Sequence, residues 1–229
     1  MADKFQCHFC KKEFTRERTL EIHLCEPKRR WMNKDDKTVR IALASWLHWC
    51  KKSGLYMNKK TALSYDDFMR STAYIAFVQF GNFVDQNNIS NYLAYIDFMI
   101  KHNYKMPSWT KDSTYEYFIK MNTRQETVEE AIQRTIKFMD KWSSDNDEEW
   151  TDFFTKITNQ QALDWLRTGR ISPWIFFTSE KAQNKLGEMT DEQIMLLDKY
   201  LDVKWWQQNL RRKPKDKQFV DQIVKEYEI

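Results

Sequence analysis

Glycine and proline are scarce in this chain, where each occurs only four times among 229 residues. This scarcity disfavours long structureless or low-complexity segments, and an aromatic content of 15% is typical of a folded protein. No stretch approaches the roughly 18 consecutive apolar residues that a membrane-spanning helix needs, and the N-terminus does not resemble a signal peptide. We therefore expect a soluble, mainly helical, cytoplasmic protein that has no membrane partner.

Cysteine is scarce as well, yet three of the four cysteines lie within residues 7–25, beside two of the four histidines. In a cytoplasmic protein, such a cluster indicates metal binding or free thiols more than disulfides. The spacing is Cys7-x2-Cys10, then twelve residues, then His23-x-Cys25. Zinc prefers thiolate sulfur and imidazole nitrogen, so we predict a zinc ion held by these four residues. The alternative is a set of free thiols whose spacing is incidental.

Residues 7–23 resemble the zinc-finger family with two cysteine and two histidine ligands, because they match its pattern Cys-x2-Cys-x3-Phe-x5-Leu-x2-His. The resemblance implies a ββα fold in which a hairpin carries the cysteines and a helix carries the histidines. It also implies that Phe14 and Leu20 form a small core. About twenty-five residues bury too little apolar surface to offset chain entropy, so a bound metal has to stabilise such a unit. We expect the segment to be unfolded without zinc.

The chain departs from that family at the fourth ligand, where the family has a second histidine and this chain has Cys25. Side chains two residues apart on a helix point about 200° from one another. Cys25 therefore reaches the ion only if the helix ends near Leu24 and the chain turns back, and Pro27 favours such an end. His8 is a weaker candidate for the fourth ligand, because it lies inside the turn that carries Cys7 and Cys10.

Positive charge is concentrated near the N-terminus. Residues 1–40 hold eleven Lys and Arg against seven Asp and Glu, whereas the other residues hold 26 of each sign. The whole net charge of +4 therefore belongs to this segment, which favours an anionic partner. In DNA-reading fingers, helix positions minus one, three and six contact bases, and the resemblance places these positions at Arg16, Thr19 and Ile22. The residues that we predict to contact nucleic acid are Arg16, Arg18, Thr19, Lys28, Arg29, Arg30 and Trp31.

Two hypotheses about function follow from these residues. In the first, the chain is a zinc-finger accessory protein that binds nucleic acid, DNA in preference to RNA, and engages another protein through its helical body. Arg16 could make a bidentate contact with guanine, whereas Ile22 could contact at most a thymine methyl group. A lone finger covers only about 3 bp. The finger would therefore anchor the protein on nucleic acid and read little sequence. In the second, the chain is a protein–protein adaptor or assembly factor whose finger docks a protein and binds no nucleic acid.

The rest of the chain is predicted to be helical. Residues 1–30 would form a zinc finger with a basic tail, and residues 31–229 an all-helical domain. Apolar residues recur at three- and four-residue steps, and Ser64 and Thr190 begin capping-box patterns. The predicted helices cover about residues 33–52, 64–83, 90–99, 111–121, 126–142, 148–157, 159–168, 190–210 and 216–227.

The segment ISPWIFF, residues 171–177, is where a strand competes with a helix. Its run of apolar residues suits a buried strand. Ser172 followed by Pro173 is equally a helix start, with proline at the first helical position, and we favour the helix.

Sequence motifs for catalysis are missing. The phosphate-binding glycine loops, the metalloprotease HExxH and the hydrolase GxSxG do not occur. Outside the finger, His48 and His102 lie among apolar residues, where a structural histidine is commoner than a catalytic base. We therefore predict that the protein is not an enzyme, while a nuclease or transferase assembled from scattered carboxylates stays open.

The whole chain also resembles a group of poorly characterised proteins of tailed bacteriophages. The resemblance lies in the order of the finger, the KRRW of residues 28–31, a long helical body and the ISPW of residues 171–174. It implies a role in phage DNA metabolism or transcription, in the cytoplasm of a bacterial host. It implies no particular reaction.

Overall fold

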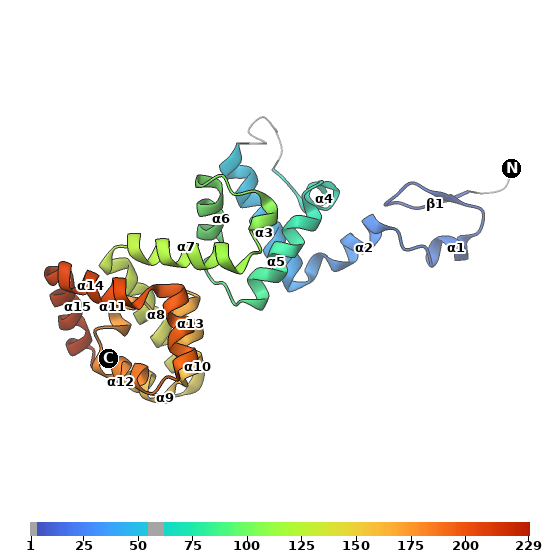
Figure 1. The fold of residues 1–229 in the computed structure, drawn as a ribbon. Coiled ribbons are helices and arrows are strands. Elements are labelled where there is room, and N and C mark those ends of the chain that lie inside the picture. Colours follow the sequence, from blue (N-terminus) through green and yellow to red (C-terminus); the bar gives the residue numbers. More distant parts are fainter. Residues whose placement is uncertain (1–3, 55–61) are drawn as a thin grey trace. The chain divides into compact units, whose positions relative to one another are not determined.

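A computed structural model describes residues 4–54 and 62–229 of the chain. These residues form fifteen α-helices, three short 3-10 helices and one two-stranded antiparallel sheet near the N-terminus (Figure 1). The predicted fold class is confirmed: the protein is mainly α, with a small N-terminal ββα segment ahead of an irregular multi-helix body. None of the described helices is both long and apolar enough to cross a membrane.

The chain divides into two compact units. Unit 1 consists of Met1–Asn88 and Tyr92–Thr110, and unit 2 of Ile89–Asn91 and Lys111–Ile229. The ββα segment belongs to unit 1. The division of the chain at residue 30 stays a prediction.

The ββα segment of unit 1 has almost no core. Strand β1 (Phe5–Gln6) pairs antiparallel with β2 (Glu13–Phe14), and helices α1 (Glu17–Glu21) and α2 (Glu26–Met32) follow. Cys7 is the only buried residue between positions 4 and 32. Apolar burial therefore contributes little to the stability of this segment.

The helical part of unit 1 has an aromatic core. It contains α3 (Lys37–Ser53), α4 (Tyr65–Arg70), α5 (Tyr74–Gln86) and α6 (Tyr92–Lys101). Ser64 caps α4 through a capping box with Asp67, as the sequence predicts. The predicted helix 64–83 is nevertheless divided, because Ser71 has an extended backbone that ends α4 before α5 begins. The largest fully buried side chains of this unit are Trp46, Tyr95, Phe68, Phe77 and Phe80.

Unit 2 is built from nine helices among its described residues. Thr127, Thr158 and Thr190 each begin a helix with a capping box. Ser172 caps a short helix that opens with Pro173, so the helix predicted for residues 171–177 is confirmed. The predicted helix 148–157 is instead a 3-10 turn, Trp150–Asp152, followed by a four-residue helix. The helices are α7 (Asp112–Gln125), α8 (Val128–Asn146), α9 (Phe153–Lys156), α10 (Asn159–Arg167), α11 (Pro173–Phe176), α12 (Glu180–Gly187), α13 (Asp191–Leu201), α14 (Val203–Arg212) and α15 (Pro214–Glu226).

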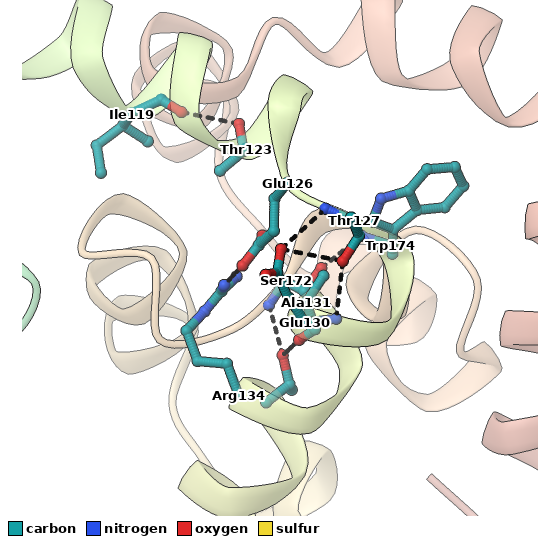
Figure 2. A network of polar contacts seen from close by, with 10 residues as sticks. Ile119, Thr123, Glu126, Thr127, Glu130, Ala131, Arg134, Ser172 and Trp174 are labelled. Carbon is teal, nitrogen blue, oxygen red and sulfur yellow. Dashed lines mark hydrogen bonds and ion pairs between the residues drawn. The ribbon is translucent and has the colours of Figure 1, made fainter. Parts of the chain in front are cut away.

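A buried polar network ties α11 to α8 (Figure 2). The Ser172 backbone N–H donates to Thr135 Oγ1 over 2.9 Å, and the Thr135 hydroxyl donates to the Ala131 carbonyl, also over 2.9 Å. The Trp174 N–H donates to Ser172 Oγ over 3.1 Å. Thr135 and Ser172 are fully buried, so each hydroxyl needs these partners to offset the cost of leaving water.

Gly81 lies where α5 packs against α3. A Cβ atom at this position would lie 2.2 Å from the Thr38 carbonyl oxygen and 3.2 Å from the Ala42 nitrogen. Both are backbone atoms of α3, which cannot move aside without displacing the helix. The close approach of the two helices therefore requires glycine at this position.

Gly81→Ala should destabilise unit 1, although alanine is normally the better helix former. We expect a loss of about 1–3 kcal/mol or more in the free energy of unfolding, because the methyl group would push α3 and α5 apart. The control is Gly187→Ala in α12, where the added Cβ meets nothing within 4 Å. That variant should be neutral or gain about 0.4–1 kcal/mol. Urea unfolding followed by circular dichroism measures both, and equal stability of the two variants would contradict the packing described for Gly81.

Candidate metal centre

Four side chains of the N-terminal segment converge on one point. The ligand atoms of Cys7, Cys10, His23 and Cys25 all lie within 4.8 Å of one another. The sulfurs of Cys7 and Cys25 are 3.9 Å apart, and Cys10 Sγ is 3.2 Å from His23 Nε2. Tetrahedral zinc places its sulfur and nitrogen ligands about 3.5–3.8 Å from one another. The donor set and its spacing therefore fit a tetrahedral metal ion.

A tight turn brings the first two ligands together. The Cys7 N–H donates to the Lys12 carbonyl over 2.9 Å, and the Lys11 N–H donates to the Cys7 carbonyl over the same distance. Lys11 has a φ of 61°, in the left-handed region, which lets the chain reverse directly after Cys10. The turn thus places both sulfurs on the same side of the hairpin.

The last two ligands come from the connection between α1 and α2. Helix α1 ends at Glu21, and residues 23–25 lie outside any helix, with extended backbone angles at Cys25. Side chains two residues apart in an extended chain point to the same side. His23 and Cys25 therefore reach the same point, while Leu24 between them is 49% exposed. Helix α1 thus ends before Cys25, which is the condition for the Cys25 sulfur to lie beside the other three ligand atoms.

His8 lies outside the cluster. Its side chain is exposed, and its ring packs edge-on against Phe9 with the centroids 5.6 Å apart. The structure therefore brings together the four residues predicted as metal ligands and leaves the weaker candidate away from them.

The protein environment acts differently on the sulfurs of Cys7 and Cys25. Hydrogen bonds from the Cys10 and Phe9 backbone N–H groups hold the pKa of Cys7 below its ordinary value, with the Cys10 N–H the larger cause. Burial raises the pKa of Cys25, and the neighbouring thiols raise it further. Only thiolates bind zinc well, so a cation between the sulfurs would offset their mutual repulsion.

A few side chains support the ligands. The Phe14 ring packs against the His23 ring with centroids 4.7 Å apart, and Leu20 is half-buried. Lys28 Nζ donates to the His23 carbonyl over 3.1 Å and to the Glu21 carbonyl over 3.4 Å. Lys28, which the sequence predicts to contact nucleic acid, therefore donates hydrogen bonds to carbonyl groups at the C-terminal end of α1 and just after it.

The other predicted contact residues differ in exposure. Arg16, Arg18 and Thr19 are exposed at the start of α1. Arg29 is 60% exposed and lies 3.8 Å from Glu26. The Trp31 side chain, 44% exposed, has the Lys34 ammonium 4.4 Å from its ring centre and the Phe9 ring at 5.7 Å.

Arg30 has a structural role that the sequence pattern did not indicate. Its Nη1 donates to the Met69 carbonyl over 2.8 Å, and its guanidinium lies 4.4 Å from the Tyr74 ring centre. Its Nε donates to Glu26 over 3.0 Å, and its carbonyl accepts a hydrogen bond from the Tyr65 hydroxyl. Only 19% of the Arg30 side chain is exposed, so this arginine fastens α2 to α4.

Comparison of the chain with protein-family models, with curated proteins and with solved structures finds no match. The likeness to zinc fingers and to phage proteins therefore rests on the residues alone.

Cobalt substitution tests the ligand set. Cobalt(II) bound to three thiolates gives a sulfur-to-cobalt charge-transfer band, and Cys25→Ala should lower this band by about one third. His8→Ala is the matched control, because His8 lies outside the cluster, and its band should equal that of the unaltered protein. An unchanged band in Cys25→Ala, with altered cobalt spectra in His8→Ala, would make His8 the fourth ligand instead.

Cys50 provides a contrasting thiol with a defined pH dependence. It is 2% exposed on α3, and burial raises its pKa to about 11 from 9.0. Both folded and unfolded chains keep this proton below pH 9, whereas only the unfolded chain loses it between pH 9 and 11. The contribution of Cys50 to the stability of unit 1 should therefore be complete below pH 9 and disappear as the pH rises toward 11. Unfolding measured across this range should show a steeper loss of stability in the unaltered protein than in Cys50→Ala, and identical slopes would contradict the raised pKa.

Proposed function

We propose that the protein is a zinc-stabilised accessory protein that binds nucleic acid and has no catalytic role of its own. The observation that carries this proposal is the exposure of Arg16 and Arg18 at the start of α1, beside the four metal ligands. A metal ion in the cluster would make this small segment rigid, and a rigid segment presents its cations at lower entropic cost.

Zinc is the metal we propose for the cluster. Three sulfurs and one imidazole nitrogen suit its preference for soft and borderline ligands in tetrahedral geometry. All four ligand positions would be filled by protein, which is typical of a structural ion and not of a catalytic one. Cys7, Cys10, His23 and Cys25 would hold it.

Phosphate contact is the mode of binding that the exposed residues support best. Arg16, Arg18 and Arg29 are cations on the surface, and such cations attract the nucleic-acid backbone without regard to sequence. Ile22 is 77% exposed at the helix position that would face a base, where its apolar side chain could touch only a thymine methyl group. We therefore propose an anchor on DNA in preference to RNA, with little sequence selectivity.

A second candidate function is favoured by exposed apolar side chains around the cluster. Ile22, Leu24 and Met32 are 77%, 49% and 60% exposed. Exposed apolar side chains in one short segment suit protein docking. In this alternative the protein is an adaptor or assembly factor, and the segment binds a protein and no nucleic acid.

The helical body is proposed to bind another protein in either case. Met195 and Leu196 on α13 are exposed apolar residues in unit 2 that would suit such a contact. The proposed setting, phage DNA metabolism or transcription in the host cytoplasm, follows only from the resemblance of the chain to phage proteins.

Arg16→Glu combined with Arg18→Glu should weaken binding of the full chain to duplex and single-stranded DNA by about tenfold or more. The change reverses two exposed charges, and the unaltered protein should show an affinity that falls linearly with salt on logarithmic axes. Fluorescence anisotropy at several salt concentrations measures both quantities. Arg30 is left intact because its side chain packs against α4 and α5.

The matched control is Lys51→Glu combined with Lys101→Glu, which reverses two exposed charges elsewhere in unit 1. This control should bind DNA with the affinity of the unaltered protein. If both double variants bind equally well, the finger does not contact DNA. Loss of a protein partner on Ile22→Ala, with no DNA binding by the unaltered chain, would establish the adaptor role instead.

A further inference from the structure

Unit 2 contains a pocket whose charged lining is entirely positive. The pocket has a volume of about 350 Å³, and no carboxylate among the described residues lines it. We call it the α8 pocket, because most of its lining comes from that helix. Its lining residues are Ser90, Arg134, Lys137, Phe138, Lys141 and Arg170.

Helical spacing gathers three of these cations. Arg134, Lys137 and Lys141 lie three and four residues apart on α8, which places them on one face of the helix. Phe138 lies on the same face between them. Because the helix is long and its N-terminus is fixed by the Thr127 capping box, the row of cations is held in register.

The fourth cation is placed by the end of α10. The Arg170 N–H donates to the Trp165 carbonyl over 2.7 Å, and the Gly169 N–H donates to the Leu166 carbonyl over 3.1 Å. This pair of bonds is a Schellman motif, which needs Gly169 in the left-handed region, and its φ is 69°. The Arg170 guanidinium then lies 5.6 Å from the centre of the Phe138 ring.

The buried network of Figure 2 holds this connection against α8. The hydrogen bond from the Ser172 N–H to Thr135 Oγ1 joins the chain two residues after Arg170 to the helix that carries the other cations. Thr135 and Ser172 are fully buried, so the junction excludes water. The pocket is therefore formed by rigid elements, as ligand sites commonly are.

The cations are only partly neutralised by neighbouring carboxylates. Arg134 forms an ion pair with Glu126, and Lys141 one with Asp145 over 3.0 Å at an exposed position, where such pairs contribute little. Lys137 makes no ion pair with another described residue, although Asp140 lines a neighbouring pocket with it. Two of the four lining cations thus have a carboxylate partner, and neither of these carboxylates lines the α8 pocket itself.

Arg134 has unused hydrogen-bonding capacity. Its Nε and Nη2 atoms are buried and have no hydrogen-bond partner among the described residues. Burial lowers its pKa to about 10, so its charged form lacks part of the stabilisation that water would give. Buried donors without acceptors cost free energy, and Oε2 of the ion-pair partner Glu126 is likewise buried without a hydrogen-bond partner among the described residues.

We propose that the α8 pocket binds a phosphate group, carried by a nucleic-acid backbone or by a free nucleotide. A phosphate group offers several acceptor oxygens and up to two negative charges, which suits two guanidinium and two ammonium groups together with the Ser90 hydroxyl. The site lies in unit 2 and does not depend on the function proposed for the metal centre.

Calorimetric titration of the full chain tests the proposal with three probes at constant ionic strength: inorganic phosphate, adenosine monophosphate and a single-stranded DNA oligonucleotide. Lys137→Gln combined with Lys141→Gln should weaken phosphate binding about tenfold, because it removes two charged donors. Both side chains are exposed, so the variant should fold normally. The control, Lys215→Gln combined with Lys225→Gln on α15, removes the same charge outside the pocket and should bind as the unaltered protein does.

The probes also distinguish the source of the phosphate. Tight binding of the strand with weak binding of the mononucleotide assigns the pocket to a nucleic-acid backbone, and the reverse assigns it to a free nucleotide. The proposal is overturned if none of the probes binds saturably, or if the α8 variant and the control have equal affinities. The Arg16→Glu, Arg18→Glu variant should bind inorganic phosphate as the unaltered protein does. An error in the function proposed for the N-terminal segment and an error in the phosphate site proposed for the α8 pocket therefore give different results.

Discussion

The N-terminal segment depends on one constraint, which is that its residues have almost nothing apolar to bury. Between positions 4 and 32 only Cys7 is buried, and the sheet consists of two residue pairs. Such a segment cannot offset its chain entropy by packing. The convergence of three sulfurs and one imidazole nitrogen is the feature that connects the hairpin to the chain after α1, and a metal ion there would contribute the missing free energy.

The arginines near this cluster differ in exposure and in the contacts that they make. The side chains of Arg16 and Arg18 are exposed to solvent. The Arg30 side chain instead contacts Glu26, Met69 and Tyr74. The contacts of Arg30 attach α2 to α4 and α5. A charge count along the chain treats all these arginines alike, so only the packing reveals which of them are exposed to solvent.

The features that the sequence predicts are those encoded by local spacing. The metal ligands, the capping box at Ser64 and the helix start at Pro173 each depend on residues a few positions apart, and the structure brings each of them together. The zinc ion and the nucleic-acid contacts stay predictions. Features that depend on distant residues could not be predicted. The contact of Arg30 with Met69 and that of Phe138 with Arg170 each join residues more than thirty positions apart, and no local pattern marks either of them.

Metal-dependent order of the N-terminal segment is the central claim, and amide hydrogen exchange of the full chain tests it most directly. With zinc bound, the amides of Cys7 and Lys11 should be protected, because both donate to carbonyls within the ligand turn. After chelation, protection should be lost throughout residues 4–25 and kept in α3 and α5, whose core needs no metal. Unchanged protection of residues 4–25 after complete removal of zinc would contradict the claim.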